Sequence, residues 1–291
     1  MYLYYKVLMV LIRIKLFLSK KNVINNEKWY TRWIVSNETH SSTMLAEINE
    51  SLEYKPLISI VLPVYNVDDV YLKECIESVR NQLYQHWQLC IADDCSTFPH
   101  VRKTLEYYCD MDDRIQVAYR DKNGHISAST NTAISLANGE FITFLDNDDL
   151  LSPLALYEIV KTINGKENQV DFLYSDEDKL LNGKRIRPFY KKKWNPKLLL
   201  HFNYICHIAV YRRGLIEELG GLREGFEGVQ DWDLALRVLK KTDRVTHIPK
   251  ILYHWRIIDS STASSERAKP YVKKMKKKVI KSYKENYWRR G

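Results

Sequence analysis

The residues best suited to do chemistry are three aspartates within four positions, Asp146, Asp148 and Asp149, which follow the apolar run 141–145. Carboxylates this close repel one another and raise each other's pKa, so they need a cation or hydrogen-bond donors to compensate them. Their oxygens are hard ligands that suit Mg²⁺ or Mn²⁺, and an ion held there can also hold a diphosphate. The alternative is a solvated acidic turn that caps the next helix, for which Ser152-Pro153 is a good start.

Two further pairs of polar residues also follow apolar runs. Tyr65-Asn66 comes after the β-prone run 57–64, and Asp93-Asp94 comes after the run 87–92. Continuous apolar runs of this kind are typical of strands that are buried on both faces of a parallel sheet. Because ligands of α/β sheets bind at the carboxyl ends of the strands, three polar clusters at such ends favour one shared site over three unrelated turns.

Strands alternate with helices along the first half of the chain, and this alternation predicts the fold class. Apolar spacing indicates helices at 70–83, 101–109, 126–137 and 154–163, and further strands at 115–119 and 141–145. Beyond these we expect strands at 170–174, 204–211 and 245–253, a hairpin around Asn182-Gly183 and a helix at 231–240. The expected fold is α/β, with a doubly wound, mostly parallel sheet and helices on both of its faces.

The composition indicates a folded protein with a substantial core. The chain has 291 residues, 45% of them hydrophobic, which is enough for one large or two small domains. Its five cysteines are odd in number and show no paired spacing, which argues against a disulfide framework or a zinc site. We therefore expect free thiols in a cytosolic protein.

The formal charge of +9 gathers at the carboxyl end of the chain. Basic residues dominate between Lys269 and Arg290, with Trp288 and several tyrosines among them. Such a segment could bind nucleic acid or an anionic membrane surface, or it could be a solvated helical face.

The amino end, residues 1–18, is apolar but is interrupted by Lys6, Arg13 and Lys15. Its uninterrupted apolar run, 7–12, is far shorter than the roughly 20 residues needed to span a bilayer. A signal peptide is not expected either, because no small-residue cleavage site follows. We expect an interfacial helix at the membrane surface, with packing on the protein's own body or on a second subunit as the alternative.

Three segments resemble, in their order and spacing, the family two glycosyltransferases: 56–66, 92–97 and 145–149. Later segments are similar to one bacterial branch of that family, which builds surface polysaccharides and includes many proteins labelled rhamnosyltransferases. They are Tyr174–Lys179, Gln230–Leu234 and His247–Arg256. The resemblance covers residues 56–263 and implies a GT-A fold and an inverting transfer from a nucleotide sugar. Residues 1–55 and 264–291 are then expected to be helical extensions.

The resemblance also implies which residues bind the donor nucleotide. Pro63, Tyr65 and Asn66 would line the base pocket. One or both of Asp93 and Asp94 would accept a hydrogen bond from the base or ribose, because a carboxylate facing a ring N–H makes a charge-assisted bond. The alternative for these two acids is a helix N-cap.

The same resemblance implies a diphosphate and metal site. Asp146 and Asp148 match the family's metal-binding acids, with Asn147 between them at the donor. The implied cofactor is Mn²⁺ or Mg²⁺, which would neutralise the leaving nucleotide. His254 is implied as a third metal ligand or a diphosphate contact, and Arg256 as a phosphate contact.

His125 begins a helix at a position where family members often carry a basic residue near the diphosphate. A helix N-terminus already favours phosphate, so the assignment is physically sensible. An ordinary surface histidine is the alternative.

Inversion by direct displacement needs a base that takes the proton of the acceptor hydroxyl. Asp231 matches the family's catalytic carboxylate and lies at a helix start behind the glycine-containing loop 225–228. Family members commonly have Glu-Asp at this point, whereas this chain has Gln230 before the aspartate, which leaves the role of the preceding acid open. Asp233 is the fallback base, and helix N-terminal charge is the alternative for both aspartates.

The expected partners are a UDP-, dTDP- or GDP-sugar and a glycan acceptor, which could be lipid-linked or protein-linked. An anionic membrane surface at the inner face of the cell membrane and a homo- or hetero-oligomer are also possible partners, whereas nucleic acid is not expected. Two other hypotheses are a nucleic-acid-binding protein that uses the basic end and an inactive partner subunit. For Asp176-Glu177-Asp178 the sequence leaves open a donor-sugar pocket or salt bridges with Lys179.

Overall fold

The computed structural model describes residues 27–38, 52–166, 169–258 and 270–288. The expected interfacial segment 1–18 lies outside these ranges. The described helices are α2 (Glu27–Asn37), α4 (Asp69–Arg80), α5 (Pro99–Met111), α6 (His125–Ile134), α7 (Ala155–Asn164), α8 (Pro196–Leu199), α9 (Arg213–Glu218), α10 (Gln230–Val238) and α11 (Pro270–Trp288). The strands are β1 (Ile58–Val64), β2 (Trp87–Asp93), β3 (Ile115–Tyr119), β4 (Phe141–Phe144), β5 (Leu150–Leu151), β6 (Phe172–Leu181), β7 (Lys184–Phe189), β8 (Ala209–Arg212) and β9 (Val245–Arg256).

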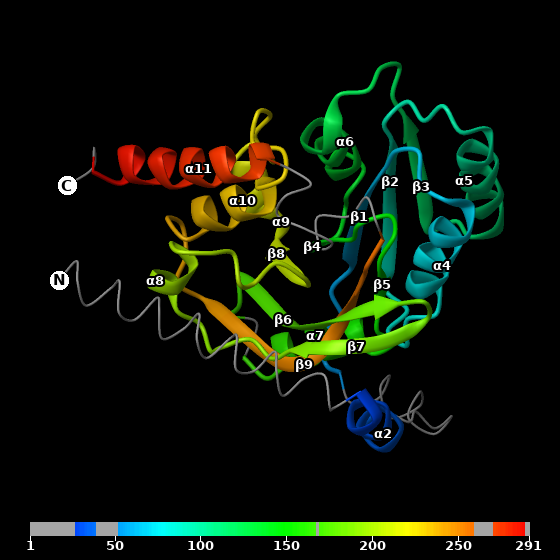
Figure 1. The fold of residues 1–291 in the computed structure, drawn as a ribbon, viewed down its shortest axis with the longest axis horizontal. Coiled ribbons are helices and arrows are strands. Elements are labelled where there is room, and N and C mark those ends of the chain that lie inside the picture. Colours follow the sequence, from blue (N-terminus) through cyan, green and yellow to red (C-terminus); the bar gives the residue numbers. More distant parts are fainter. Residues whose placement is uncertain (1–26, 39–51, 167–168, 259–269, 289–291) are drawn as a thin grey trace.

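Within the described ranges these nine strands form one curled sheet (Figure 1). Its order is β3-β2-β1-β4-β8-β6-β9-β5, and β7 pairs with the outer part of β6. The β3-β2-β1-β4 half is parallel throughout, as the alternation of strands and helices predicts. From β8 onward antiparallel pairs are mixed with the parallel β6–β9 pair.

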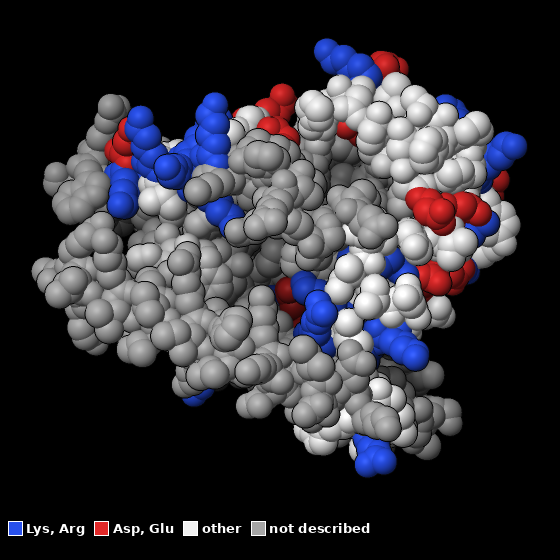
Figure 2. All heavy atoms as spheres, viewed as in Figure 1, with Lys and Arg blue, Asp and Glu red and all other residues white. Residues whose placement is uncertain are grey.

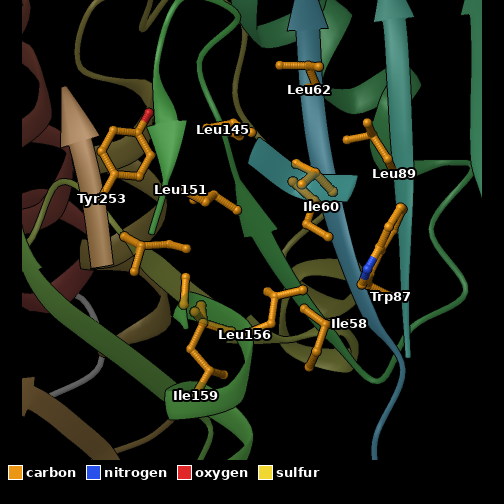
Figure 3. Close-up of a cluster of buried hydrophobic side chains, with 14 of the residues drawn as sticks. Ile58, Ile60, Leu62, Trp87, Leu89, Leu145, Leu151, Leu156, Ile159 and Tyr253 are labelled. Atoms are coloured by element: carbon orange, nitrogen blue, oxygen red, sulfur yellow. The ribbon is translucent and has the colours of Figure 1, made fainter. Parts of the chain in front are cut away.

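Helices cover both faces of the sheet, and each face has its own core. On one face Ile58, Ile60 and Leu62 of β1 meet apolar residues of α4, α5 and α7. Figure 3 shows part of this cluster, with side chains of β1, β2, α7 and β9 pointing toward one another. On the other face Val61 and Ile142 meet residues of α6, α9, α10 and α11. The alternation of β1 side chains between the two cores explains its continuous apolar sequence, and the expected α/β fold is confirmed.

Two strands are longer than the sequence predicts, and this changes where their side chains point. β6 extends through Asp176, Glu177 and Asp178, which were expected after a strand that ended at residue 174. β9 likewise continues to Arg256. The two strands pair along their length, with Asp178 opposite His254. Side chains in these segments therefore alternate between the two faces of the sheet.

Near the chain ends the structure describes two helices that pack on this body. α2 lies beside the β6–β7 hairpin, and α11 lies along α10 (Figure 1). The Tyr30 hydroxyl donates to Oδ2 of Asp178 at 2.6 Å, and Nε of Arg185 donates to the same oxygen at 2.6 Å. In the described part of the chain, no helix combines the length and apolar character needed to cross a membrane.

Candidate functional site

A cleft of about 1710 Å³ lies at the carboxyl ends of β1, β2 and β4. The parallel half of the sheet brings these ends together, as the sequence predicts for its polar clusters. The predicted site residues that line the cleft are Pro63, Tyr65, Asn66, Asp94, His125, Asp146, Asn147, Asp148 and Asp231. Three others are placed differently: Asp93, His254 and Arg256 are not part of the lining.

Asn66 joins the ends of β1 and β2 at one wall of the cleft. Its backbone is left-handed, with φ of 46°, a conformation that asparagine tolerates better than most residues. Its Oδ1 accepts from the backbone N–H groups of Thr97 at 2.7 Å and Phe98 at 3.1 Å. The Asn66 amide therefore holds the loop after β2, while the neighbouring residue Tyr65 is 46% exposed at the cleft.

Asp94 is buried beneath the same wall. Its carboxylate accepts from the N–H of Gly124 at 3.0 and 3.1 Å and pairs with Nε of Arg120 at 2.8 Å. Asp93 accepts from the N–H of Ser96 at 3.2 Å. The helix that follows, α5, has Phe98 as its N-cap, so neither aspartate caps it. Arg120 is a charge partner that the sequence did not single out.

His125 is the first residue of α6 and is exposed at the cleft. Its φ of 63° turns the chain sharply into the helix. The N-cap, Gly124, supplies no side chain, so the helix begins without a side-chain cap. The N–H of His125 donates to Oδ1 of Asn123 at 3.2 Å. The other N–H groups of the first turn have no partner within the helix itself, and with the helix dipole they make such an end favourable for an anion.

The acidic turn lies between β4 and β5. Asp146 is partly exposed, whereas burial and the nearby Asp146 charge raise the pKa of Asp148 to about 6. Asp149 is fully buried and accepts from the Tyr253 hydroxyl at 2.6 Å and the N–H of Arg256 at 2.7 Å. Burial, followed by its two acidic neighbours, raises the pKa of Asp149 well above its usual range.

The alternative that this turn caps the next helix is therefore wrong for Asp149. The N-cap of α7 is Leu154, which makes no side-chain capping bond. Asp149 instead accepts hydrogen bonds from Tyr253 and Arg256, which hold the turn against β9. Because Asp149 is used in these buried hydrogen bonds, Asp146 and Asp148 are the acids of this turn that line the cleft.

His207 is a site residue that sequence reasoning missed. Its Nε2 lies 3.7 Å from Oδ2 of Asp146, and its ring stacks on Tyr253 at 4.6 Å. The edge of the same ring meets Trp255 at 4.8 Å. On its other side, Nδ1 lies 3.6 Å from Oε2 of Glu177 and makes no hydrogen bond within the described ranges.

The sequence did carry a signal for His207. β8 runs antiparallel to β4 with Thr143 opposite Val210. Residues just before β8 must therefore lie beside residues just after β4, which are the acidic turn. The polar pair Cys206-His207 precedes β8, but the expected strand at 204–211 placed this pair inside a strand.

Glu177 supports His207 from beneath the cleft. It pairs with Nζ of the buried Lys191 at 3.0 Å and with Nζ of Lys179 at 3.3 Å. Burial alone would raise the pKa of Glu177, but Lys191 and His207 outweigh burial and hold it well below its usual range. The open question about the acidic triplet is thus answered in favour of ion pairs, since Asp178 also pairs with Arg185.

His254 faces away from the cleft. Because β9 alternates, Tyr253 and Trp255 point toward His207, whereas Nδ1 of His254 meets Oδ1 of Asp178 at 2.7 Å. This buried contact occupies Nδ1 of His254, and His254 does not line the cleft with Asp146 and Asp148, so the geometry argues against His254 as a metal ligand. The prediction treated residue 254 as following the strand, whereas the strand contains it.

Arg256 binds the back of the acidic turn. Its Nε donates to the carbonyl oxygen of Asp148 at 2.6 Å, and its Nη2 donates to Glu74 at 2.6 Å. These bonds occupy the guanidinium outside the cleft lining. Arg256 therefore positions the turn, in place of the expected contact with phosphate.

Asp231 lies at the start of α10 and faces the cleft. Its Oδ2 accepts from Nδ2 of Asn203 at 2.6 Å and from the Cys206 thiol at 3.2 Å. Burial, and then the Asp231 charge, raises the pKa of the Cys206 thiol well above its usual range, so this cysteine stays protonated as a donor. Gln230 accepts from the N–H of Gly228 at 2.6 Å and so closes the preceding loop.

Asp233, the fallback base, has a structural role. It is buried and accepts from Nε of Arg223 and Nε of Arg237, each at 2.9 Å. It does not line the cleft. Asp231 is therefore the carboxylate of α10 that is available to a ligand.

Two adjacent residues connect the acidic turn to the helix. Cys206 contacts Asp231, and His207 lies beside Asp146. The cleft thus holds a pair of carboxylates that suit a divalent cation, Asp146 and Asp148, and a separate carboxylate on α10, Asp231, that suits proton transfer.

Comparison with known proteins gives a family match. The model of Glycosyl transferase family 2 matches residues 59–220. The chain is 44% identical over 242 residues to "Uncharacterized protein y4gI" of Sinorhizobium fredii, and 37% identical over 239 residues to "O-antigen biosynthesis protein RfbC" of Myxococcus xanthus. Each match covers 82% of this chain but only 26% and 18% of the respective relative, so the chain spans about a quarter or less of their length.

Two solved structures share the fold. Staphylococcus aureus TarS 1–349 in complex with UDP-GlcNAc aligns with a TM-score of 0.61 and 18% identity, covering 78% of this chain and 71% of that one. The mannosyltransferase PcManGT from Pyrobaculum calidifontis, in complex with GDP-Man and Mn²⁺, aligns with a TM-score of 0.54 and 19% identity, covering 71% and 59%. At these identities the likeness shows the fold alone.

Proposed function

The chain belongs to glycosyl transferase family 2, and from this premise we propose that it moves a sugar from a nucleotide sugar to a glycan by inverting displacement with a divalent metal. One observation carries the proposal. A single cleft is lined by Asp146 and Asp148 at one strand end and by Asp231 at a helix start. A transfer of this kind needs both a site for the diphosphate and a base for the acceptor.

The metal ligands in this proposal are Asp146 and Asp148. Their oxygen chemistry fits Mg²⁺ or Mn²⁺, and the pKa of Asp148, raised to about 6 by its burial and by the Asp146 charge, supports a need for a compensating positive charge. Since two carboxylates are fewer ligands than either ion takes, the diphosphate and water must supply the rest. When bound, the ion would neutralise charge on the leaving nucleotide. His207 stands beside Asp146 and can orient it or contact the diphosphate.

Donor recognition is assigned to the wall formed by β1, β2 and α6. Tyr65 offers an exposed ring for the base, and the buried Asp94 offers a carboxylate edge. Asn66 holds the loop between these two strands. The start of α6 at His125 is directed at the cleft, where its N–H groups and ring suit a diphosphate.

The base in this proposal is Asp231. The Asn203 amide and Cys206 thiol hold its Oδ2. Its Oδ1 accepts from the N–H of Trp232 at 2.7 Å, and the second lone pair of this oxygen can receive the proton of an acceptor hydroxyl. Direct displacement through this base inverts the sugar carbon. The wall of the cleft at Asp231 is then the acceptor side, and the wall at Tyr65 is the donor side.

The setting follows from the relatives, whose names refer to O-antigen biosynthesis and, in a shorter match, to teichuronic acid biosynthesis. We accordingly propose a surface-polysaccharide acceptor, with residues 56–263 as the catalytic domain and 1–55 and 264–291 as extensions. The complexes of TarS with UDP-GlcNAc and of PcManGT with GDP-Man make UDP- and GDP-sugars the first donors to test, followed by dTDP-sugars. A membrane surface and an oligomer stay predictions.

A thermal-shift series tests the proposal. The protein is heated with Mn²⁺ and each of a panel of UDP-, dTDP- and GDP-sugars, since a ligand at 100 times its Kd adds about 2.7 kcal/mol to stability. One nucleotide class should raise Tm in wild type, and D146N/D148N should lose that rise. The exposed Asp113→Asn is the matched control and should keep it. If no nucleotide sugar raises Tm in the presence of metal, the proposal fails.

A further inference from the structure

A second groove, of about 490 Å³, opens beside the cleft between α10 and α11. It is lined by His201, Trp232, Lys276, Lys277, Ile280, Lys281, Lys284 and Glu285. Trp232 and Lys276 line the cleft as well, so the groove continues from the cleft wall that carries Asp231. We call this surface the lysine groove.

We propose that the lysine groove binds the acceptor, and that the acceptor is a glycan chain carrying repeated negative charges, such as uronate or phosphodiester groups. The inference rests on the proposed function, because it takes Asp231 as the base and its side of the cleft as the acceptor side.

The groove is predominantly positively charged. Four lysines line it against one glutamate, Glu285, whose carboxylate lies 3.7 Å from Nζ of Lys281. Lys276 and Lys284 are eight residues apart on one helix, which at 1.5 Å per residue spreads these charges over about 12 Å. A line of cations of that length suits a ligand with charges along its length better than a single anion.

The geometry of α11 explains why these lysines gather on one side. Lys276, Ile280 and Lys284 follow one another at the i, i+4 spacing that places side chains on one helical face, and Lys277 and Lys281 form the adjacent row. Val279 is buried in the core against α10, which fixes the orientation of the helix. Figure 2 shows lysine and arginine side chains gathered over α11.

Two other anionic partners fit the groove less well. Single-stranded nucleic acid is held by bases stacking on exposed aromatic rings, but Trp232 is only 3% exposed and its Nε1 donates to the Leu199 carbonyl at 2.8 Å. A membrane surface is held by an exposed apolar helical face, but Met275, Val279, Ile280 and Tyr283 of the described part of α11 all pack on the core. A hydrophilic, charged chain has neither requirement.

The test measures binding of probe chains at several salt concentrations. Oligogalacturonate and poly(glycerol phosphate) are the anionic probes, and a dextran oligosaccharide of matched length is the neutral one. Wild type should bind an anionic probe and not dextran. The double variant K277Q/K281Q should bind it about 5- to 30-fold more weakly, since two partly exposed ion pairs are each worth about 0.5 to 1 kcal/mol.

The matched control is K103Q/K166Q, which removes the same charge from exposed positions outside both the groove and α11. It should keep wild-type affinity. The proposal is overturned if the control loses as much affinity as K277Q/K281Q, or if dextran binds as well as the anionic probes. A single-stranded oligonucleotide and phosphatidylglycerol vesicles are tested alongside these probes, and the proposal is also overturned if only the oligonucleotide or the vesicles bind.

Donor binding in the same variants separates this inference from the proposed function. K277Q/K281Q should keep the Tm rise with nucleotide sugar and Mn²⁺, and in a transfer assay its KM for the anionic acceptor should rise with little change in kcat. If nucleotide sugar and Mn²⁺ do not raise the Tm of wild type, the enzyme proposal is refuted. A normal donor response with no preference for anionic chains would refute the lysine groove alone.

Discussion

Nε2 of His207 lies 3.7 Å from Oδ2 of Asp146, and a stacked Tyr253 ring holds the imidazole in that position. The contact joins the acidic turn after β4 to the loop before β8. The same loop reaches Asp231 through Cys206. A change at His207 should therefore alter the surroundings of Asp146, at the proposed metal site.

We predict that His207→Ala weakens Mn²⁺ binding in the presence of the donor nucleotide by about 10- to 100-fold, the range found when a group that orients a metal ligand is lost. Calorimetric titration of Mn²⁺ measures it. His86→Ala is the control, because His86 is exposed and its Nδ1 contacts the Lys55 carbonyl away from the cleft. Equal Mn²⁺ affinity in both variants would mean that His207 only fills space.

Asp231→Asn should abolish transfer without loss of donor binding. A positioned base contributes about 10²- to 10⁴-fold to rate, so kcat should fall by at least that lower factor while the donor-induced Tm rise stays. The contacts from Asn203 and Cys206 are to Oδ2, and an amide oxygen in that position retains them, whereas the amide nitrogen cannot accept the Trp232 N–H that Oδ1 accepts in wild type. Transfer at the wild-type rate would remove Asp231 as the base.

Asp233→Asn should lower the stability of the fold, in contrast to Asp231→Asn, which should lower the rate of transfer. Asp233 is buried between Arg223 and Arg237, so its neutralisation leaves two guanidinium groups without their anion. We expect a loss of about 3 kcal/mol in the free energy of unfolding, near the lower end for a broken buried pair because Arg223 is partly exposed. Denaturant unfolding measures this loss. A stable but inactive Asp233→Asn would contradict the structural role.

Gly124→Ala tests how Asp94 is held. A Cβ at residue 124 would collide with Arg120 and would come within 2.9 Å of the Ala128 Cβ. Arg120 must then move from Asp94, and nucleotide binding should weaken about tenfold, the equivalent of one lost charge-assisted hydrogen bond. Gly214→Ala is the control, since a Cβ there meets nothing within 4 Å. Nucleotide titration of both variants measures the effect. Equal nucleotide affinities of the two variants would show that the contacts of Asp94 with Gly124 and Arg120 do not contribute to nucleotide binding.

Stability should fall in acid partly through Asp171. Burial opposes ionisation of this carboxyl, but hydrogen bonds from Arg244 and Thr242 outweigh burial and hold its pKa below the usual range. Its contribution is therefore full above the unfolded value, about 3.9, and is lost as pH falls through the lower folded value. Asp171→Asn should lower the free energy of unfolding at pH 7 by about 2 kcal/mol. This is less than the roughly 3 to 5 kcal/mol lost when a fully buried ion pair is broken, because Arg244 is half exposed.

Chemical unfolding between pH 2 and 7 measures that dependence. The difference between wild type and Asp171→Asn should shrink as pH falls below 4. Asp113→Asn, an exposed aspartate, should follow the wild-type curve. A constant difference at all pH values would show that the Asp171 charge does not contribute.

The parallel half of the fold could be predicted from sequence because its two central strands, β1 and β2, are short and buried on both faces. That pattern alone brings Tyr65, Asp94 and Asp146 to one edge of the sheet. The mixed half could not be predicted in the same way. Whether His254 or His207 meets the acidic turn depends on how far β9 and β6 extend, and the pairing of charged residues such as Asp178 extends them beyond their apolar segments.

Tyr30→Phe should loosen α2 without affecting the cleft. In wild type the Tyr30 hydroxyl donates to Asp178 at 2.6 Å and accepts from Nη2 of Arg185 at 3.2 Å. These groups belong to a buried cluster that also includes His254. We expect a loss of about 1 to 3 kcal/mol, because Asp178 is left short of one donor in a buried site. The effect should appear as faster proteolysis within α2, while the donor-induced Tm rise stays. Tyr107→Phe, at a 56% exposed tyrosine, is the control. If α2 is cleaved equally fast in wild type and Tyr30→Phe, the Tyr30–Asp178 bond does not anchor the helix.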